Sequence, residues 1–355
     1  MVRVAGLMSI LAAGLILPGC SSSNEDPPRT PFAEDRGAPN DPKDPTKIKF
    51  AEDRLPRPGA AKDPNPTPFD GERGIKYLKQ LCDIGTRISG SDGMKKQQEF
   101  LIKHFEGLGG TVTKQEFQAK QTSRRDKVDM TNLIVSWFPD RKSRIILCCH
   151  YDTRPSADQE ADPRRWGKPF ISANDGTSGV AFMMELANHM KDFPTGVGVD
   201  FVFFDGEEYV FTGPAAGDDR YFFGSEYFAS EYTAKKAKLP YTYTAAILFD
   251  LCMHDGARLA IEGHSWKGAK ALVTDIWGIA ETNGAKSFRF ERGFGRADDV
   301  LDDHLALLNA GIPAIDIIDF DYKHWHLLSD TPDKCSAAQM TSVASVITTW
   351  LKSKK

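Results

Sequence analysis

Five short apolar runs, rich in β-branched and aromatic residues, most constrain the fold of this chain. They span 131–138, 145–149, 199–204, 245–249 and 312–318. Such solid runs predict strands that are buried on both faces, as in parallel sheets. Helical periodicity lies between and after them, for example at Val180, Met183 and Ala187 and at Val343 and Ile347. The alternation predicts an α/β fold: a single domain with a mostly parallel twisted central sheet and helices on both faces.

Further helices are expected around this framework. Tyr77, Leu78 and Leu81 indicate a helix before the first strand, and 224–238 and 266–283 have the pattern of crossover helices. We also expect a helix that starts near Asp298 and is closed by Gly311-Ile312-Pro313, which leads into the last strand.

The N-terminus has the pattern of an export signal. Arg3 is followed by an apolar stretch over 4–17 and then by Leu17-Pro18-Gly19-Cys20. The stretch is too short to span a bilayer as a mature helix, and the small residue before Cys20 is typical of lipoprotein processing. We expect a signal peptide over 1–19 and a lipid on Cys20, with an ordinary cleaved signal or an uncleaved anchor as alternatives. The protein is therefore expected to be exported and anchored to the cell envelope, facing the periplasm or the outer surface.

The next segment, 20–68, is rich in Pro and charged residues and poor in apolar ones. It cannot bury enough surface to offset its ordering entropy, so we expect a disordered tether, followed by one catalytic domain over 69–355. The formal net charge is -4 and no block of Lys and Arg occurs, which argues against nucleic acid as a partner.

Polar clusters follow directly after several of the predicted strands. His150, the Asp205-Gly206-Glu207-Glu208 sequence and Asp250 each end an apolar run. Because sites in open parallel sheets form beyond the carboxyl ends of the strands, these groups are expected at one rim. Asp175, before a predicted helix, and His326, after the last strand, complete a set of ligand types that suits zinc in an open catalytic site.

Each of these residues also has an ordinary explanation. Asp175 could cap a helix, Asp250 could be a loop acid, and His150 or His326 could be a core histidine. Glu207 and Glu208 could be a solvated pair, whereas a chain turn would let one ligate a metal while the other handles protons.

Several motifs together resemble the zinc exopeptidase superfamily and, within it, the glutaminyl cyclases. An Asp-Asp-His followed later by a Trp-His favours the cyclase branch. The sequence departs from animal cyclases after Glu208, where their tryptophan is lacking, and at Asp321-Tyr322-Lys323, which replaces a more apolar loop. The motifs are His150-Tyr151-Asp152-Thr153-Arg154-Pro155, Ala173-Asn174-Asp175-Gly176-Thr177-Ser178-Gly179-Val180, Phe203-Phe204-Asp205-Gly206-Glu207-Glu208, Phe223-Gly224-Ser225, Asp302-Asp303-His304 and Trp325-His326.

The resemblance implies a glutaminyl-peptide cyclotransferase that converts N-terminal Gln of peptides or proteins to pyroglutamate and releases ammonia. In the cyclase pattern one zinc ion is held by Asp175, Glu208 and His326. Glu207 then moves protons, Asp250 and Asp302 share hydrogen bonds around the amine and ammonia positions, and Trp325 forms an apolar wall of the pocket.

Two other functions remain open. In the two-zinc aminopeptidase pattern Asp175 bridges the ions, His150 and Glu208 hold one, and Asp250 and His326 hold the other, so that His150 and Asp250 complete a second site. The third possibility is a non-catalytic lipoprotein that binds peptides in the same pocket, which the retention of Glu207 makes the weakest of the three.

Overall fold

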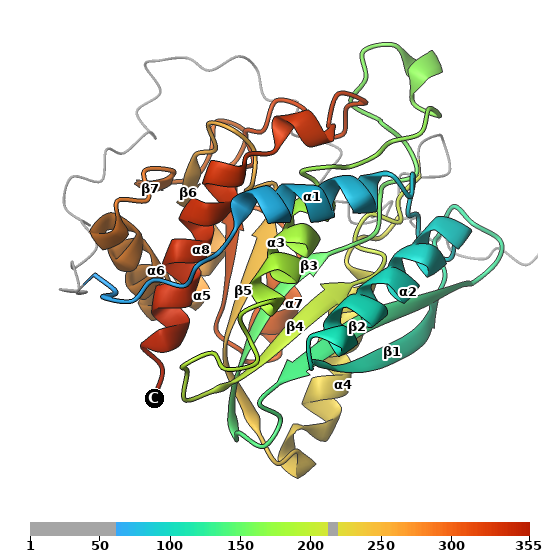
Figure 1. The fold of residues 1–355 in the computed structure, drawn as a ribbon. Coiled ribbons are helices and arrows are strands. Elements are labelled where there is room, and N and C mark those ends of the chain that lie inside the picture. The colour runs from blue at the N-terminus through green and yellow to red at the C-terminus, as the bar shows by residue number, and fades with distance from the viewer. Residues whose placement is uncertain (1–61, 212–218) are drawn as a thin grey trace, which may run out of the picture. The chain divides into compact units, whose positions relative to one another are not determined.

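A six-stranded mixed sheet forms the centre of the protein (Figure 1). The structure is a computed structural model that describes residues 62–211 and 219–355. The strand order is β1-β2-β4-β3-β5-β8, and β4, β3, β5 and β8 are mutually parallel, whereas β2 pairs antiparallel with both β1 and β4. The strands are β1 (Thr111–Ala119), β2 (Val128–Trp137), β3 (Ser143–His150), β4 (Gly198–Phe204), β5 (Thr242–Asp250) and β8 (Ala314–Ile318).

All five predicted strands are confirmed, as β2, β3, β4, β5 and β8. The prediction missed β1 and a small two-stranded sheet made by β6 (Leu259–Ile261) and β7 (Phe288–Arg292). β1 is an edge strand whose residues are largely exposed or half-buried. Its polar sequence therefore lacks the apolar run by which the inner strands are recognised.

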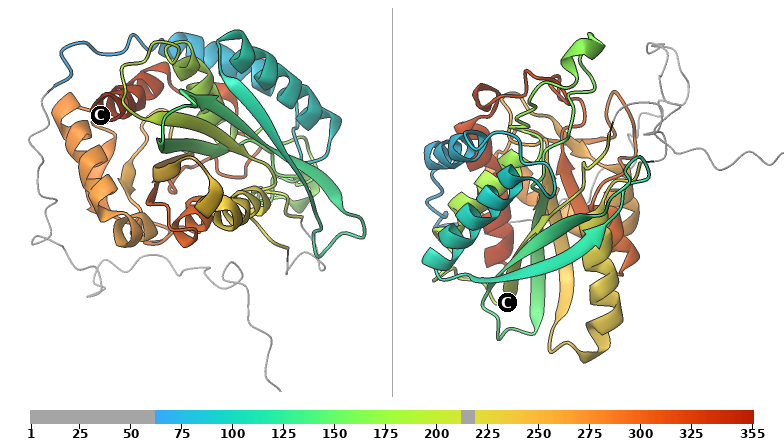
Figure 2. Two further views of the ribbon diagram at one scale, coloured as in Figure 1. Left: turned by 90° about the horizontal axis from the view of Figure 1, so that it is seen from below. Right: turned by 90° about the vertical axis from the view of Figure 1, so that its right-hand side faces the viewer.

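Helices cover both faces of the sheet (Figure 2). The main core lies between the sheet and α1 (Gly71–Cys82), α2 (Asp92–Gly107), α3 (Thr177–Ala187), α6 (Lys270–Asn283) and α8 (Ala337–Lys352). A second core on the other face contains residues of α4 (Phe223–Lys235) and α7 (His304–Asn309). The short α5 (Gly263–Gly268) contacts β8. The expected α/β fold with helices on both faces is confirmed.

Three helices differ from expectation. The single helix expected over 266–283 is divided at Ala269 into α5 and α6. The predicted helix through Val180 is present as α3, but all its residues are buried because it packs between the sheet and α1. α7 begins at His304 and not near Asp298. The carboxylate of Glu262 accepts a hydrogen bond from the N–H of Val300 (3.0 Å). This N–H is therefore bonded to a distant side chain and not to a helical carbonyl. The segment before His304 therefore stays irregular and carries Asp302.

The first described residues, 62–68, have irregular backbone and lie within the segment expected to be a tether. Lys352 of α8 donates to Asp63 Oδ2 (2.9 Å) and to the carbonyl oxygen of Asn65 (2.5 Å). The predicted signal peptide over 1–19, Cys20 and the rest of the tether lie outside the described residues. In the part of the chain that the structure describes, no helix has the length and hydrophobicity needed to cross a membrane.

Candidate functional site

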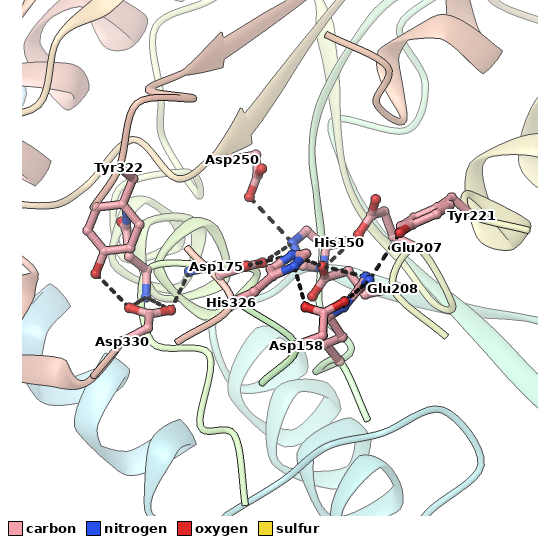
Figure 3. Close-up of polar contacts among 12 residues, drawn as sticks. His150, Asp158, Asp175, Glu207, Glu208, Tyr221, Asp250, Tyr322, His326 and Asp330 are labelled. Carbon is pink, nitrogen blue, oxygen red and sulfur yellow. Dashed lines mark hydrogen bonds and ion pairs between the residues drawn. The ribbon is translucent and has the colours of Figure 1, made fainter. Parts of the chain in front are cut away.

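The predicted site residues meet at the carboxyl edge of the sheet (Figure 3). His150 and Asp250 are the last residues of β3 and β5, and Glu207 and Glu208 follow the end of β4. Asp175 lies in the turn before α3, and His326 lies in the loop after β8. Residues far apart in the sequence are thus brought together because parallel strands end at the same rim.

Two groups of possible metal ligands share Asp175. The first is Asp175, Glu208 and His326, and the second is His150, Asp175 and Asp250; within each group the ligand atoms lie within 4.8 Å of one another. His326 Nε2 is 2.6 Å from Glu208 Oε1, and His150 Nε2 is 3.2 Å from Asp175 Oδ1. No group among the described residues joins Asp250 to His326. The aminopeptidase pairing of Asp250 with His326 stays a prediction, and a second site that contains His150 and Asp250 is possible.

Unpartnered buried atoms show that these residues fit a metal ion. Asp175 Oδ2 and Glu208 Oε2 are buried oxygens without a hydrogen-bond partner. Asp250 Oδ1 and His150 Nδ1 have only longer contacts, with His150 Nε2 at 3.4 Å and with Asp152 Oδ1 at 3.6 Å. A buried carboxylate that lacks a partner is costly, and a divalent cation removes that cost. Imidazole nitrogens and carboxylate oxygens are ligands that zinc accepts.

The turn that contains Asp175 rules out the helix-cap explanation for this residue. The N-cap of α3 is Gly176, with a φ of 72°, and no side chain caps the helix. A Cβ atom at Gly176 would lie 2.5 Å from His150 Cε1, so glycine is needed both for the backbone conformation and for the space. The carboxylate of Asp175 is therefore free of capping.

A buried ion-pair network supports His326 and Glu208. Asp158 Oδ1 lies 3.0 Å from His326 Nδ1, which leaves Nε2 directed at the ligand group. Arg154 donates to Asp158 Oδ2 (2.7 Å), to the hydroxyl of Tyr221 (3.0 Å) and to Glu208 Oε1 (3.4 Å). The guanidinium thus links the two carboxylates on either side of the imidazole.

These contacts set the charges of the ligand group. Burial and Arg154 lower the pKa of His326, but Glu208 and Asp158 outweigh them and raise it to about 9. Burial raises the pKa of Glu208, but His326 and Arg154 lower it to about 2. Glu208 is therefore an ionised carboxylate, as a ligand must be.

Glu207 and Glu208 follow a turn at Gly206, whose φ is 75°. The N–H groups of Glu207 and Glu208 donate to the two oxygens of Asp152 (3.2 and 3.1 Å). Both glutamates are buried, so the alternative of a solvated pair is wrong. Burial, Glu208 and Asp302 raise the pKa of Glu207 well above its usual value, although His150 opposes them.

Asp302 and Trp325 also lie at this rim. Asp302 is buried in the loop before α7, and burial, Asp250 and Asp303 raise its pKa well above the usual value. The Trp325 ring is half-buried, with its centroid 4.1 Å from that of His326. It therefore lies directly beside the ligand group, and its role as a pocket wall stays a prediction.

Sequence reasoning did not assign roles to the supporting residues, which are Asp152, Arg154, Asp158, Tyr322 and Asp330. Asp152 and Arg154 lie in a quoted motif, but nothing in the spacing of Asp158 or Asp330 distinguishes them from other loop acids. Asp316 was also missed, although an acid inside the apolar run 312–318 is a usable signal. It is buried, and burial, Asp302 and Asp250 raise its pKa well above the usual value.

Comparison with known proteins places this site in a family. Residues 132–351 match the model of peptidase family M28. The structure is similar to the crystal structure of Fimbriiglobus ruber glutaminyl cyclase, with 62% sequence identity and a TM-score of 0.81, over 83% of this chain and 98% of that one. The chain belongs to the glutaminyl cyclase branch of peptidase family M28.

Two other similar proteins bear on the functional question. A leucine aminopeptidase precursor from Bacteroides thetaiotaomicron is 28% identical, with a TM-score of 0.74, over 82% of this chain and 99% of that one. The glutaminyl-peptide cyclotransferase of Gloydius blomhoffii is 24% identical over 287 residues, which make up 74% of this chain and 75% of the relative. The similar proteins thus include relatives named for cyclisation and one named as an aminopeptidase.

Proposed function

We propose that this protein is a zinc-dependent glutaminyl-peptide cyclotransferase, which converts the N-terminal Gln of peptides or proteins to pyroglutamate and releases ammonia. The observation that carries the proposal is the 62% identity to the Fimbriiglobus ruber cyclase across 98% of that chain. Asp175, Glu208 and His326 would hold one zinc ion, a role that the proximity of their ligand atoms and the unpartnered oxygens support.

In this reaction the α-amine of the peptide attacks its own γ-carboxamide carbon. A new C–N bond forms, the bond to the amide nitrogen breaks, and one proton moves from the amine to the departing ammonia. Bound zinc would supply Lewis-acid polarisation of the carboxamide oxygen. The enzyme mainly has to hold amine and amide together, because intramolecular attack already has an entropic advantage.

Glu207 is the proposed proton carrier. Its raised pKa suits a group that takes the amine proton and returns it to the leaving nitrogen. Asp250 and Asp302 would hydrogen-bond the amine and ammonia positions, and Trp325 would form an apolar wall of the pocket. The buried site limits access of water, which this reaction does not consume.

A two-zinc aminopeptidase is the second candidate, and one observation favours it. His150, Asp175 and Asp250 form a second ligand group, with His150 Nε2 3.4 Å from Asp250 Oδ1. With two metal ions at the rim, Glu207 would activate water for peptide hydrolysis. A non-catalytic peptide-binding protein is the remaining alternative.

An assay on the purified protein, combined with its zinc stoichiometry, separates these functions. We expect one zinc ion per chain and conversion of Gln-initiated peptides to a product lighter by ammonia, detected by mass spectrometry. Release of the first amino acid from peptides without N-terminal Gln, together with two zinc ions, would establish the aminopeptidase instead. If the protein acts on neither kind of peptide, the non-catalytic peptide-binding function would be favoured.

We further propose that the protein is exported and held at the cell envelope by a lipid on Cys20. The export pattern over 1–19 and the position of Cys20 directly after it support this location. The segment 20–68 would then place the catalytic domain at a distance from the membrane surface, where peptide N-termini are accessible.

A further inference from the structure

Asp330 is a fully buried acid that none of the proposed steps uses. Its Oδ1 accepts hydrogen bonds from the N–H of Asn174 (3.0 Å) and from the hydroxyl of Tyr322 (2.7 Å). Its Oδ2 lies 3.2 Å from the N–H of Asn174 and accepts from the N–H of Asp175 (3.2 Å). One carboxylate therefore holds the turn that carries the shared metal-ligand candidate (Figure 3).

The side chain of Asp175 depends on this turn for its position. Its Oδ2 has no hydrogen-bond partner, and Gly176 is in the left-handed region, so the turn is not held by helical bonds at this point. Ser178 donates to the carbonyl oxygen of Asn174 (2.7 Å), which fixes the side of the turn nearer the helix. On the other side the peptide N–H groups of Asn174 and Asp175 are held by Asp330.

Tyr322 supplies the one side-chain donor to Asp330 among the described residues. It is buried, and its ring packs against His254 with a centroid distance of 4.6 Å. It is also the middle residue of Asp321-Tyr322-Lys323, the segment in which the sequence departs from the apolar loop of animal cyclases. The loop 319–330 thus carries Tyr322, Trp325, His326 and Asp330 together.

We propose that Tyr322 and Asp330 act as a brace that positions Asp175 for the metal ion. The inference rests on the proposed zinc site and adds two positioning residues to it. Because Asp330 follows His326 by four positions, the brace also ties Asp175 to the loop that carries His326, a ligand candidate far away in the sequence. Removing a group that orients a metal ligand in this way typically weakens metal binding about 10-fold to 100-fold.

The test compares zinc affinity in the full-length protein and three variants, by competition with a chromophoric chelator. Tyr322→Phe removes only the hydroxyl, and Asp330→Asn keeps the shape but loses one acceptor. Both are expected to bind zinc about 10-fold to 100-fold more weakly. Excess zinc should restore turnover, because the residues act through the metal ion.

Tyr243→Phe is the matched control. Tyr243 is a buried tyrosine that donates to Asp200 Oδ2 (2.6 Å), and it lies near the start of β5, whereas Asp250 ends the same strand. Loss of the Tyr243 hydroxyl should lower the melting temperature of the protein and leave its zinc affinity unchanged.

Two results would overturn the inference. If folded Tyr322→Phe protein binds zinc as tightly as the wild type, the brace has no role in metal binding, whether or not Asp330→Asn folds. If the control weakens zinc as much as Tyr322→Phe does, the effect comes from general destabilisation. A wild-type chain that binds no zinc would instead overturn the proposed metal site, and the brace with it.

Discussion

Glu207 and Glu208 are chemically identical neighbours with different surroundings. Glu208 faces His326 and Arg154, which hold its pKa at about 2 despite burial. Glu207 lies among other acids, and its pKa is raised well above the usual value. Pairs of titratable groups whose environments separate their pKa values are typical of active sites with divided acid and base roles.

The separate roles of the proton carrier and the metal ligands predict that substitutions at Glu207 and at His326 lose different properties. Glu207→Gln should lower kcat by about 10²-fold to 10⁴-fold, the usual contribution of a positioned acid or base, while the protein keeps its zinc. His326→Ala should lose the metal ion, because one of three ligands is missing. Turnover of a Gln-peptide and zinc content by atomic absorption check both outcomes. Loss of zinc from Glu207→Gln would contradict the assignment and make Glu207 a ligand.

At the scale of elements, Glu262 joins α5, β8 and α7. It caps α5 through the N–H groups of His264 and Ser265, and its Oε2 lies 3.1 Å from His304 Nε2 at the start of α7. The hydroxyl of Ser265 donates to Glu262 and accepts from the N–H of Asp316 on β8. These bonds fix the loop that carries Asp302 beside the sheet edge.

The contacts of Glu262 predict a dependence of stability on pH. Burial raises the pKa of Glu262, but His304 and backbone N–H groups lower it to about 2 from an ordinary value of 4.5. A lowered pKa in the folded state stabilises the protein above the unfolded-state pKa, and this contribution of about 3 kcal/mol is lost as pH falls towards 2. Urea unfolding should therefore show a large deficit for Glu262→Gln near neutral pH and a smaller one at acid pH. An equal deficit at both pH values would disprove the linkage.

At the scale of the whole molecule, the candidate site and the first described residues of the chain lie at different parts of the domain. The site lies at the carboxyl edge of the sheet, whereas Asp63 meets Lys352, in the last turn of α8. Both partners of this ion pair are partly exposed, so it is worth at most about 1 kcal/mol. Attachment to the membrane is therefore expected to leave the site free.

The proposed lipid predicts how the protein partitions. In an expression host that processes lipoproteins, the wild type should enter the detergent phase, and Cys20→Ala should enter the aqueous phase, because an acyl chain supplies the membrane affinity. Both forms should have equal activity on Gln-peptides. Phase separation in a nonionic detergent followed by immunoblotting measures this, and a wild type found in the aqueous phase would rule out lipidation.

Much of this arrangement could be predicted because its signals are local. The inner strands are solid apolar runs, and the polar residues that end them mark the rim, so β3, β4 and β5 indicated His150, Glu208 and Asp250. β1 was missed because an exposed edge strand needs no apolar face. The start of α7 was misplaced because Glu262, which is distant in the sequence, accepts a hydrogen bond from the N–H of Val300.

The sequence by itself determined which polar residues follow the buried strands, and these residues indicated the family and the metal-ligand candidates. They could be read from the sequence because hydrophobic periodicity and motifs depend only on residues that are close together in the chain. Only the tertiary structure decided which ligands share a group, how His326 and Arg154 set the charge of Glu208, and that Asp330 holds the turn of Asp175. The contacts of Arg154 with Glu208 and of Asp330 with Asp175 join residues more than fifty positions apart. Such contacts depend on how distant segments pack together, so no local sequence pattern predicts them.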